Sequence, residues 1–340
     1  MDIKYDVLEK EIINQTDLRP VYLLYGNEKY LIDSILKKIK KRFGELVLGI
    51  NYIIIDETNV TELVTNIEMP AFGYDKKIII VKNSGLFKKD GRKKEATPVQ
   101  KQVTNYFEEN FSILQEMANI VFVEEEVDKN AVFDSISKIG VICKIDELKP
   151  IQLVVRLKQI CALYKVSVDD NTLNYFIETS GTNLQVLINE IRKLIEYAGV
   201  GGVISKEAVD LLAIKQMESV IFDLTDNLGT KKIDKAIEVL DNLIYQKEPI
   251  QKILITLYNH FKKLYLCEMA IKFNKDVVQA LNLKPNQTFL VSKYKKQASY
   301  FKEKDLEKIL KEFVEIDYKS KNGLVDINVG LRSVLCSYCS

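Results

Sequence analysis

The sequence contains very few of the residues that enzymes use for catalysis or for metal binding. Its 340 residues include a single histidine, and its five cysteines are scattered along the chain. It has no G-x-S-x-G motif, no H-E-x-x-H motif and no paired Cys/His ligand set. These absences exclude the familiar forms of nucleophilic and zinc catalysis. We therefore expect no catalytic residue and no metal site, and we expect the chemistry to belong to a partner.

Long apolar runs and a disulfide framework are also missing. No run approaches the roughly 20 apolar residues of a membrane helix, and Met1–Lys4 lacks the apolar core of a signal peptide. An odd number of cysteines without regular spacing suits a reducing compartment. Cys336 and Cys339 form a C-x-x-C pair on a predicted apolar helix, but no second pair accompanies them, which indicates a structural role. We expect a cytoplasmic protein without membrane contact.

The chain has almost no net charge, at +1, which argues against a protein whose main task is to coat nucleic acid. Two short segments are nevertheless strongly basic. The first is a loop around Asp90 and Gly91 with Lys88, Lys89, Arg92, Lys93 and Lys94. The second lies on helical sequence and contains Lys293, Lys295, Lys296, Lys302 and Lys304. Each segment is either a solvated surface or a contact for DNA phosphates, and the residues leave both interpretations open.

The stretch Tyr22–Asp33 reads as a buried strand, a tight loop and the start of a helix, which is where a nucleotide-binding domain places its phosphate loop. A working loop has the pattern G-x-x-x-x-G-K-[ST], in which glycine amides, a lysine and a hydroxyl hold the phosphates and Mg²⁺. Here Gly26 is followed by Asn27–Tyr30, without a second glycine and without a Ser or Thr after a lysine. The strand, loop and helix of a nucleotide site are predicted, but the residues that bind phosphate and Mg²⁺ are missing.

The next strands lack the metal-binding acids as well. Ile78–Val81 is typical of a strand buried on both faces of a parallel sheet. In an NTPase this strand ends in acids that hold Mg²⁺ and orient water, but here it ends in Lys82 and Asn83. The strand Ile120–Val123 ends in Glu124, Glu125 and Glu126, which we interpret as a solvated acidic edge rather than a metal site. We predict no ATP hydrolysis and no bound cofactor.

The pattern of elements changes along the chain. Strands predicted at 20–25, 51–56, 76–82, 119–124 and 140–145 alternate with amphipathic helices, which indicates an α/β domain with a mostly parallel sheet over 1–147. Short helices follow over 148–213, where Asp169 or Asp170 caps a helix and Gly199–Gly202 reads as a linker that lets this small domain pivot. From 214 to 340 the pattern is helical throughout, and His260 lies on a core-facing helix as a core or surface residue.

This order of domains resembles the delta subunit of bacterial DNA polymerase III, a subunit of the clamp loader. The resemblance covers nearly the whole chain, and its pieces occur in order and at suitable spacing. They are Val21–Ile32, Met69–Phe72, Gly181–Leu184, Asn189–Leu194, Phe222–Asp226 and Asp317–Gly323.

The resemblance implies an AAA+-like α/β domain with a degenerate nucleotide site, then a small helical lid domain, then an all-α collar domain for oligomerisation. It implies a protein without ATPase activity, a non-catalytic part of the polymerase holoenzyme, that binds the beta sliding clamp and opens it for loading onto primed DNA. Its partners would be tau/gamma and delta-prime type subunits, in a cytoplasmic, nucleoid-associated replisome. Asp317, Lys321 and Gly323 would be structural within the collar domain.

The resemblance also assigns the clamp-binding site to Met69, Pro70, Ala71 and Phe72. A helix predicted over Thr61–Glu68 ends before Pro70, because proline disfavours helix at the residue before it. By its residues alone Phe72 reads as part of the core, although an aromatic between Pro70 and Gly73 is easily projected outward. The position of this segment in the delta pattern favours the outward orientation.

Two alternatives from other classes stay open. One is a nucleotide-dependent enzyme with a divergent phosphate loop, which ATP binding by the isolated chain would favour. The other is a DNA-binding replication module that uses the basic 88–94 loop, which tight and salt-sensitive binding to primed DNA would favour.

Overall fold

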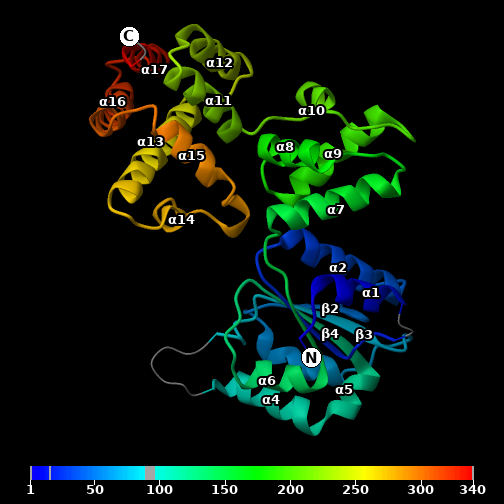
Figure 1. Ribbon diagram of the computed structural model, residues 1–340. Coiled ribbons are helices and arrows are strands. Elements are labelled where there is room, and N and C mark those ends of the chain that lie inside the picture. The colour runs from blue at the N-terminus through cyan, green and yellow to red at the C-terminus, as the bar shows by residue number, and fades with distance from the viewer. Residues whose placement is uncertain (1, 15–16, 89–95, 339–340) are drawn as a thin grey trace. The chain divides into compact units, whose positions relative to one another are not determined.

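The structure is a computed structural model that describes residues 2–14, 17–88 and 96–338. The chain splits into two compact units, residues 1–147 and residues 148–340, and each is described here by itself (Figure 1). A further division of the second unit into 148–213 and 214–340 stays a prediction.

The first unit is built on a five-stranded parallel sheet with the strand order β2-β3-β4-β1-β5. In the middle of the sheet Leu23 pairs with Phe122 on one side and with Ile142 on the other. The predicted parallel sheet is confirmed, and each strand begins and ends close to its expected bounds. The strands are β1 (Val21–Tyr25), β2 (Tyr52–Ile55), β3 (Lys77–Lys82), β4 (Ala118–Glu124) and β5 (Val141–Lys144).

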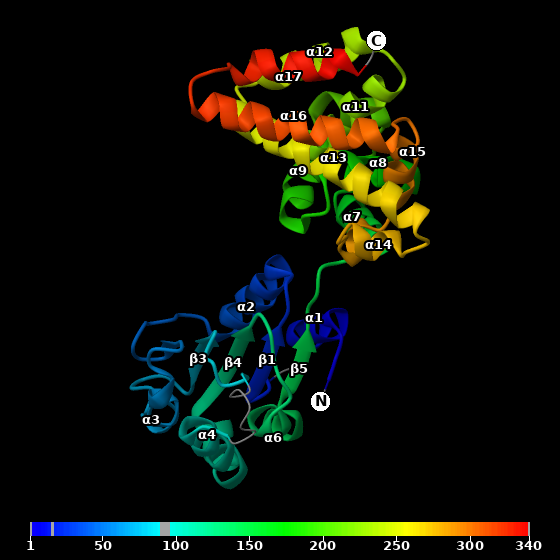
Figure 2. The same ribbon diagram turned by 90° about the vertical axis from the view of Figure 1, so that its left-hand side faces the viewer.

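Helices cover both faces of this sheet. Successive residues of its central strands point to opposite faces, and because nearly all of them are apolar, both faces must be buried. Val21 and Leu23 belong to a core shared with the helices α3 to α6, while Tyr22 and Leu24 are buried on the other face, where α1 and α2 lie (Figures 1 and 2). The elements are α1 (Tyr5–Asn14), α2 (Lys29–Phe43), the 3-10 helix η1 (Val60–Glu62), α3 (Leu63–Glu68), α4 (Pro98–Glu109), α5 (Phe111–Met117) and α6 (Ala131–Ile139).

The parallel direction of the strands sorts the loops onto two opposite edges of the sheet. Loops that follow β1, β3 and β4 meet at the carboxyl edge. The loop between β1 and α2 is one of these. Loops that precede the strands lie at the amino edge, and the segment 69–76 between α3 and β3 is one of these. The degenerate phosphate loop and the Met69–Phe72 segment are therefore on opposite edges.

The second unit is helical throughout its described residues, with a lone bridge between Ser167 and Val203. No helix in the described part of the chain is both long enough and apolar enough to span a membrane. The elements are α7 (Pro150–Leu163), α8 (Asp170–Ser180), α9 (Leu184–Ala198), α10 (Lys206–Leu212), α11 (Met217–Gly229), α12 (Ile233–Tyr245), α13 (Ile250–Lys272), α14 (Val277–Ala280), the 3-10 helix η2 (Pro285–Gln287), α15 (Leu290–Ala298), α16 (Glu303–Lys321) and α17 (Ile327–Ser337).

One hydrophobic core joins the helices α11 to α17. Its buried members all lie between Met217 and Leu335. At its centre the ring of Phe261 on α13 packs against Phe313 on α16, with 5.6 Å between the ring centroids. This core therefore encloses itself without residues from α7 to α10.

The structure confirms one predicted cap and corrects two other expectations. Asp169 caps α8 by accepting a hydrogen bond of 2.8 Å from the Thr172 amide. Gly199–Gly202 is a hydrogen-bonded turn rather than a pivot, because the Gly201 amide donates to the Lys165 carbonyl at 2.9 Å and the Ser167 amide donates to the Gly202 carbonyl at 3.0 Å. The helical pattern expected throughout 214–340 is interrupted, since Pro285 begins the separate turn η2 and α15 begins only at Leu290.

We predict that a fragment of residues 214–340 folds by itself, because the core of α11 to α17 is self-contained. Circular dichroism should show a helical fragment with a single cooperative thermal transition. The fragment 1–147, which holds the whole sheet, is the matched control and should fold as well. A 214–340 fragment that is unfolded, or that melts without cooperativity, would show that this division of the chain is wrong.

Candidate functional site

At the carboxyl edge of the sheet, main-chain hydrogen bonds engage two amides of the loop between β1 and α2. The Gly26 amide donates to the Glu124 carbonyl at 3.2 Å, and the Glu28 amide donates to the Ile145 carbonyl at 3.1 Å. Gly26 has a φ of 128°, and a Cβ there would lie 2.4 Å from the Ile145 oxygen. The glycine is thus needed for a close crossing of two backbone segments, and two amides that could cradle a phosphate are already in use.

The charges at this edge oppose a bound triphosphate. A cavity of about 800 Å³, which we call the acidic cavity, opens beside the loop. It is lined by two lysines, Lys88 and Lys144, and by six carboxylates, Glu57, Glu124, Glu125, Glu126, Asp128 and Asp146. Lys144 is paired with Asp146 at 2.8 Å, and Lys29 at the start of α2 is paired with Glu125 at 2.8 Å. No cluster of His, Cys, Asp or Glu among the described residues has the geometry of a metal site.

The structure corrects the interpretation of Glu124–Glu126 as a solvated edge. Glu124 is buried, and one of its carboxylate oxygens accepts hydrogen bonds from the amide and the hydroxyl of Ser84, at 2.9 and 2.6 Å. Burial raises the pKa of Glu124, and the bonds from Ser84 oppose that rise. Glu124 therefore fixes the loop after β3, while Glu125 and Glu126 are exposed as expected.

At the amino edge, residues 69–73, which we call the tip, lie in the loop that leads from α3 to β3. Helix α3 ends at Glu68, and the Tyr74 amide donates to the Ala71 carbonyl at 3.1 Å, which closes a four-residue turn. Gly73 is the third residue of this turn and has a φ of 90°, a conformation that favours glycine. Phe72 is the second residue, and its side chain is exposed.

Exposure within the tip divides its residues into two groups. Phe72 is 71% exposed and Met69 is 47% exposed, whereas Ala71 is 7% exposed. Pro70 is also exposed. The structure thus exposes an aromatic and a thioether side chain on one short segment, and it buries Ala71, which lies between them in the sequence. Large exposed apolar side chains of this kind mark interaction surfaces when they are grouped.

Sequence reasoning missed the residue that holds this turn in place. Lys77, the first residue of β3, is 1% exposed, and its ammonium donates to the carbonyl of Asn66 at 2.6 Å and to the carbonyl of Met69. Burial lowers the pKa of Lys77. The period of two in β3 was a usable signal, because Lys77 shares a sheet face with the buried Ile79 and Val81.

The basic loop is described only in part. Lys88 is exposed and belongs to the lining of the acidic cavity. Lys89, Arg92, Lys93 and Lys94 lie outside the described residues. A contact of this loop with DNA stays a prediction. In the second basic segment, Lys293 is paired with Glu178 on α8 at 2.7 Å.

Two comparisons of the sequence decide its family. A family model described as DNA polymerase III, delta subunit matches residues 22–138, and a second, described as DNA polymerase III delta subunit, C-terminal domain, matches residues 218–338. This chain belongs to the family of DNA polymerase III delta subunits.

Individual relatives agree with this family. The chain is 28% identical to a probable DNA polymerase III subunit delta of Aquifex aeolicus, over 97% of this chain and 94% of the relative. It is 22% identical to the DNA polymerase III subunit delta of Bacillus subtilis, over 92% of this chain and 91% of the relative. A solved structure titled Bacillus subtilis DNA clamp loader delta protein has the same fold, with a TM-score of 0.76 at 18% identity over 98% of this chain and 99% of that chain.

Two delta-like motifs of the helical unit make contacts within this chain. Gln297 on α15 is buried, and its amide nitrogen donates to the Phe222 carbonyl and to the Asp226 carboxylate, both at 2.8 Å. The Phe222–Asp226 motif is thus tied to α15. Asp317 and Lys321 form an ion pair of 2.7 Å along α16, and Gly323 follows that helix with a φ of 70°. Cys336 is a free, exposed cysteine, and its C-x-x-C partner Cys339 lies outside the described residues.

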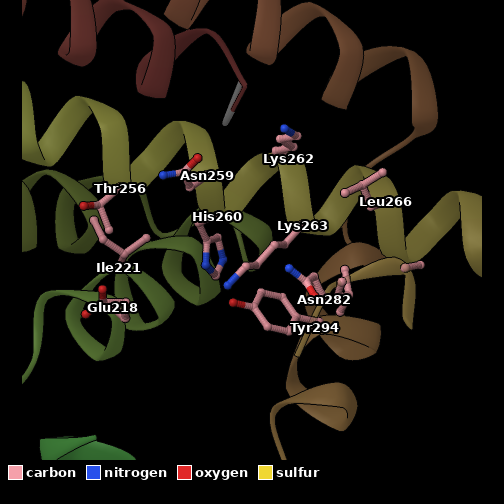
Figure 3. A pocket seen from close by; sticks show the side chains of 12 residues that line it. Glu218, Ile221, Thr256, Asn259, His260, Lys262, Lys263, Leu266, Asn282 and Tyr294 are labelled. Carbon is pink, nitrogen blue, oxygen red and sulfur yellow. The ribbon is translucent and has the colours of Figure 1, made fainter. Parts of the chain in front are cut away.

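The single histidine belongs to the same network and borders a cavity of about 460 Å³ (Figure 3). His260 Nε2 lies 2.8 Å from the Gln297 oxygen, and because both protons of the Gln297 amide are donated elsewhere, the imidazole must be the donor. Burial lowers the pKa of His260 to about 4, so the imidazole is neutral. In Figure 3 Lys263 extends toward His260 and Tyr294, and its ammonium lies 5.6 Å from the centre of the Tyr294 ring.

We predict that His260 titrates near pH 4 rather than near 6.5, and that the free energy of unfolding falls as the pH is lowered between these two values. A histidine with a lowered pKa in the folded state contributes its full stability above pH 6.5 and loses it as the pH falls toward 4. The difference between the pKa values of the folded and unfolded states corresponds to about 3 kcal/mol of folding free energy. Because the chain has one histidine, its resonance in a proton NMR titration is unambiguous.

The variant His260→Gln gives the matched control for stability, because it keeps a donor for Gln297 and cannot titrate. Between pH 6.5 and 4, its free energy of unfolding in urea should fall less than that of the parent chain. A histidine resonance that titrates near 6.5, or equal pH dependence of the two proteins, would contradict this assignment.

Proposed function

We propose that this delta-family chain is a non-catalytic subunit of a clamp loader, that its tip binds the beta sliding clamp, and that this binding helps to open the clamp for loading onto primed DNA. The observation that carries the proposal is the exposure of Phe72 on a turn whose first residue, Ala71, is buried. The family of the chain and the printed name of its structural relative support the role in clamp loading.

The size of the Phe72 side chain is adequate for the task. Burying a phenylalanine removes ~150–250 Å² from water, which is worth roughly 4–6 kcal/mol before ordering costs. Met69 beside it adds flexible apolar surface that adapts to a pocket. Binding can open a ring only if the open ring is bound more tightly than the closed one, since equal affinity for two states shifts neither.

The absence of ATPase activity in this proposal follows from the carboxyl edge. The loop amides are engaged, six carboxylates surround the cavity, and Lys82 and Asn83 follow the core of β3 where an NTPase has acids. ATP hydrolysis would then come from tau/gamma type subunits, with a delta-prime type subunit completing the assembly in the cytoplasm. The helices α11 to α17 would form this chain's part of the collar.

We predict that the isolated chain neither binds nor hydrolyses ATP, because in the described part of the carboxyl edge six carboxylates line the acidic cavity against two lysines. Calorimetric titration with ATP and Mg²⁺ should give no binding heat, and Lys29→Ala should change nothing. The pure chain would contradict this part of the proposal if it hydrolysed ATP in a Mg²⁺-dependent way and if Lys29→Ala abolished that activity.

We predict that Phe72→Ala weakens binding to the sliding clamp of the same genome by roughly 30- to 1,000-fold, as expected for the loss of a central aromatic anchor of about 2–4 kcal/mol. Because Phe72 is exposed, the fold should not change. Surface plasmon resonance gives the affinity, and circular dichroism checks the fold.

Phe273→Ala is the matched control, because Phe273 is also an exposed phenylalanine, at the end of α13. It should leave the clamp affinity unchanged. If Phe72→Ala binds and loads the clamp normally, the assignment of the tip is wrong.

A further inference from the structure

The lysine beneath the tip is in an unusual setting for its residue type. Lys77 is among the largest side chains of the chain that are fully buried, whereas lysine is almost never fully buried unless it is paired. No ion pair in the described part of the chain includes it. Its charge is instead met by the main-chain carbonyls of Asn66 and Met69.

Those two carbonyls belong to the end of α3, where the helix leaves its last oxygens without partners inside the helix. The negative end of the helix dipole favours a cation at this place. The ammonium also reaches the backbone of Met69, the first residue of the tip, from the first residue of β3. It thus joins the two ends of the segment 69–76 across the base of the loop.

The rest of the loop has few other attachments among the described residues. Ala71 is buried, and the turn is closed by one hydrogen bond from Tyr74 to Ala71. Gly73 is exposed, and a Cβ placed on it would meet no atom within 4 Å. The direction in which Phe72 projects is therefore set largely by the place where α3 stops and β3 begins, which is where Lys77 binds.

We propose that Lys77 is a positioning residue for clamp binding: it holds the end of α3 against β3, so that Phe72 is presented in its binding orientation before the clamp arrives. This inference rests on the proposed function of the tip. Lys77 itself is covered and does not touch the partner. Its effect on affinity comes from preorganisation, because a loose tip must be ordered when the complex forms.

The test uses the full chain and the sliding clamp of the same genome. Lys77→Met keeps most of the buried stem and removes the ammonium, and it should weaken clamp binding by roughly tenfold or more, the loss expected for a charge-assisted hydrogen bond. Lys77→Arg keeps a charged donor and should bind more tightly than Lys77→Met. Lys82→Met, at the exposed far end of the same strand, makes the same change of charge and should bind as the parent chain does.

A double-mutant cycle separates positioning from a general loss of stability. In a Phe72→Leu background, which keeps part of the side chain, Lys77→Met should cost much less affinity than it does in the parent chain, because both changes act through Phe72. Hydrogen exchange should also speed up at the Met69 and Tyr74 amides in Lys77→Met, while amides of the central strands stay protected.

The outcomes are distinguishable from those for the tip itself. If Phe72→Ala loses binding and Lys77→Met keeps it, or if the two losses are additive, the positioning role is overturned and the tip remains. If Phe72→Ala keeps binding, the proposed function fails first. Should Lys77→Met not fold, Lys77→Gln, which is too short to reach both carbonyls, replaces it in every comparison.

Discussion

The central strands of the first unit run in one direction and are buried on both faces, and this constraint decides which parts of that sheet can meet a partner. Side chains of β1, β3 and β4 are covered by the two layers of helices, so the sheet itself reaches a partner through the loops at its two edges. The carboxyl edge carries the acidic cavity and the amino edge carries the tip. At the carboxyl edge two loop amides are engaged by main-chain carbonyls, and the amino edge carries the exposed Phe72 and Met69.

Three buried polar side chains do similar work at three places in the chain. Glu124 holds the loop after β3 by accepting from Ser84, Lys77 holds the end of α3, and Gln297 joins α11, α13 and α15. Each of the three side chains is buried and forms hydrogen bonds with main-chain atoms. These bonds satisfy polar groups that would otherwise be left without partners. Buried polar contacts of this kind fix the place of a segment more narrowly than apolar packing does.

If the tip binds the clamp as proposed, the binding energy comes from a small number of residues. An exposed aromatic on a short, anchored turn can supply this energy, because little conformational freedom is lost when it enters a pocket. The helical core of α11 to α17 contains no residue of the sheet, so the proposed assembly and the proposed clamp binding use different parts of the chain. The neutral His260 within that core serves packing and hydrogen bonding rather than acid–base catalysis.

The sequence by itself determined the strands, the parallel sheet and most of the helices, because these follow from local periodicity such as Ile78–Val81 and from local caps such as Asp169. It also shows that Gly26 is followed by no second glycine and by no Ser or Thr after a lysine, so the pattern of a working phosphate loop is absent. Tertiary structure alone decided that Phe72 is exposed, that Glu124 is buried and that Lys77 lies under the tip. The physical reason is distance along the chain: Glu124 is covered by a loop 40 residues earlier, and Lys77 binds a carbonyl 11 residues earlier, so no local pattern records either contact.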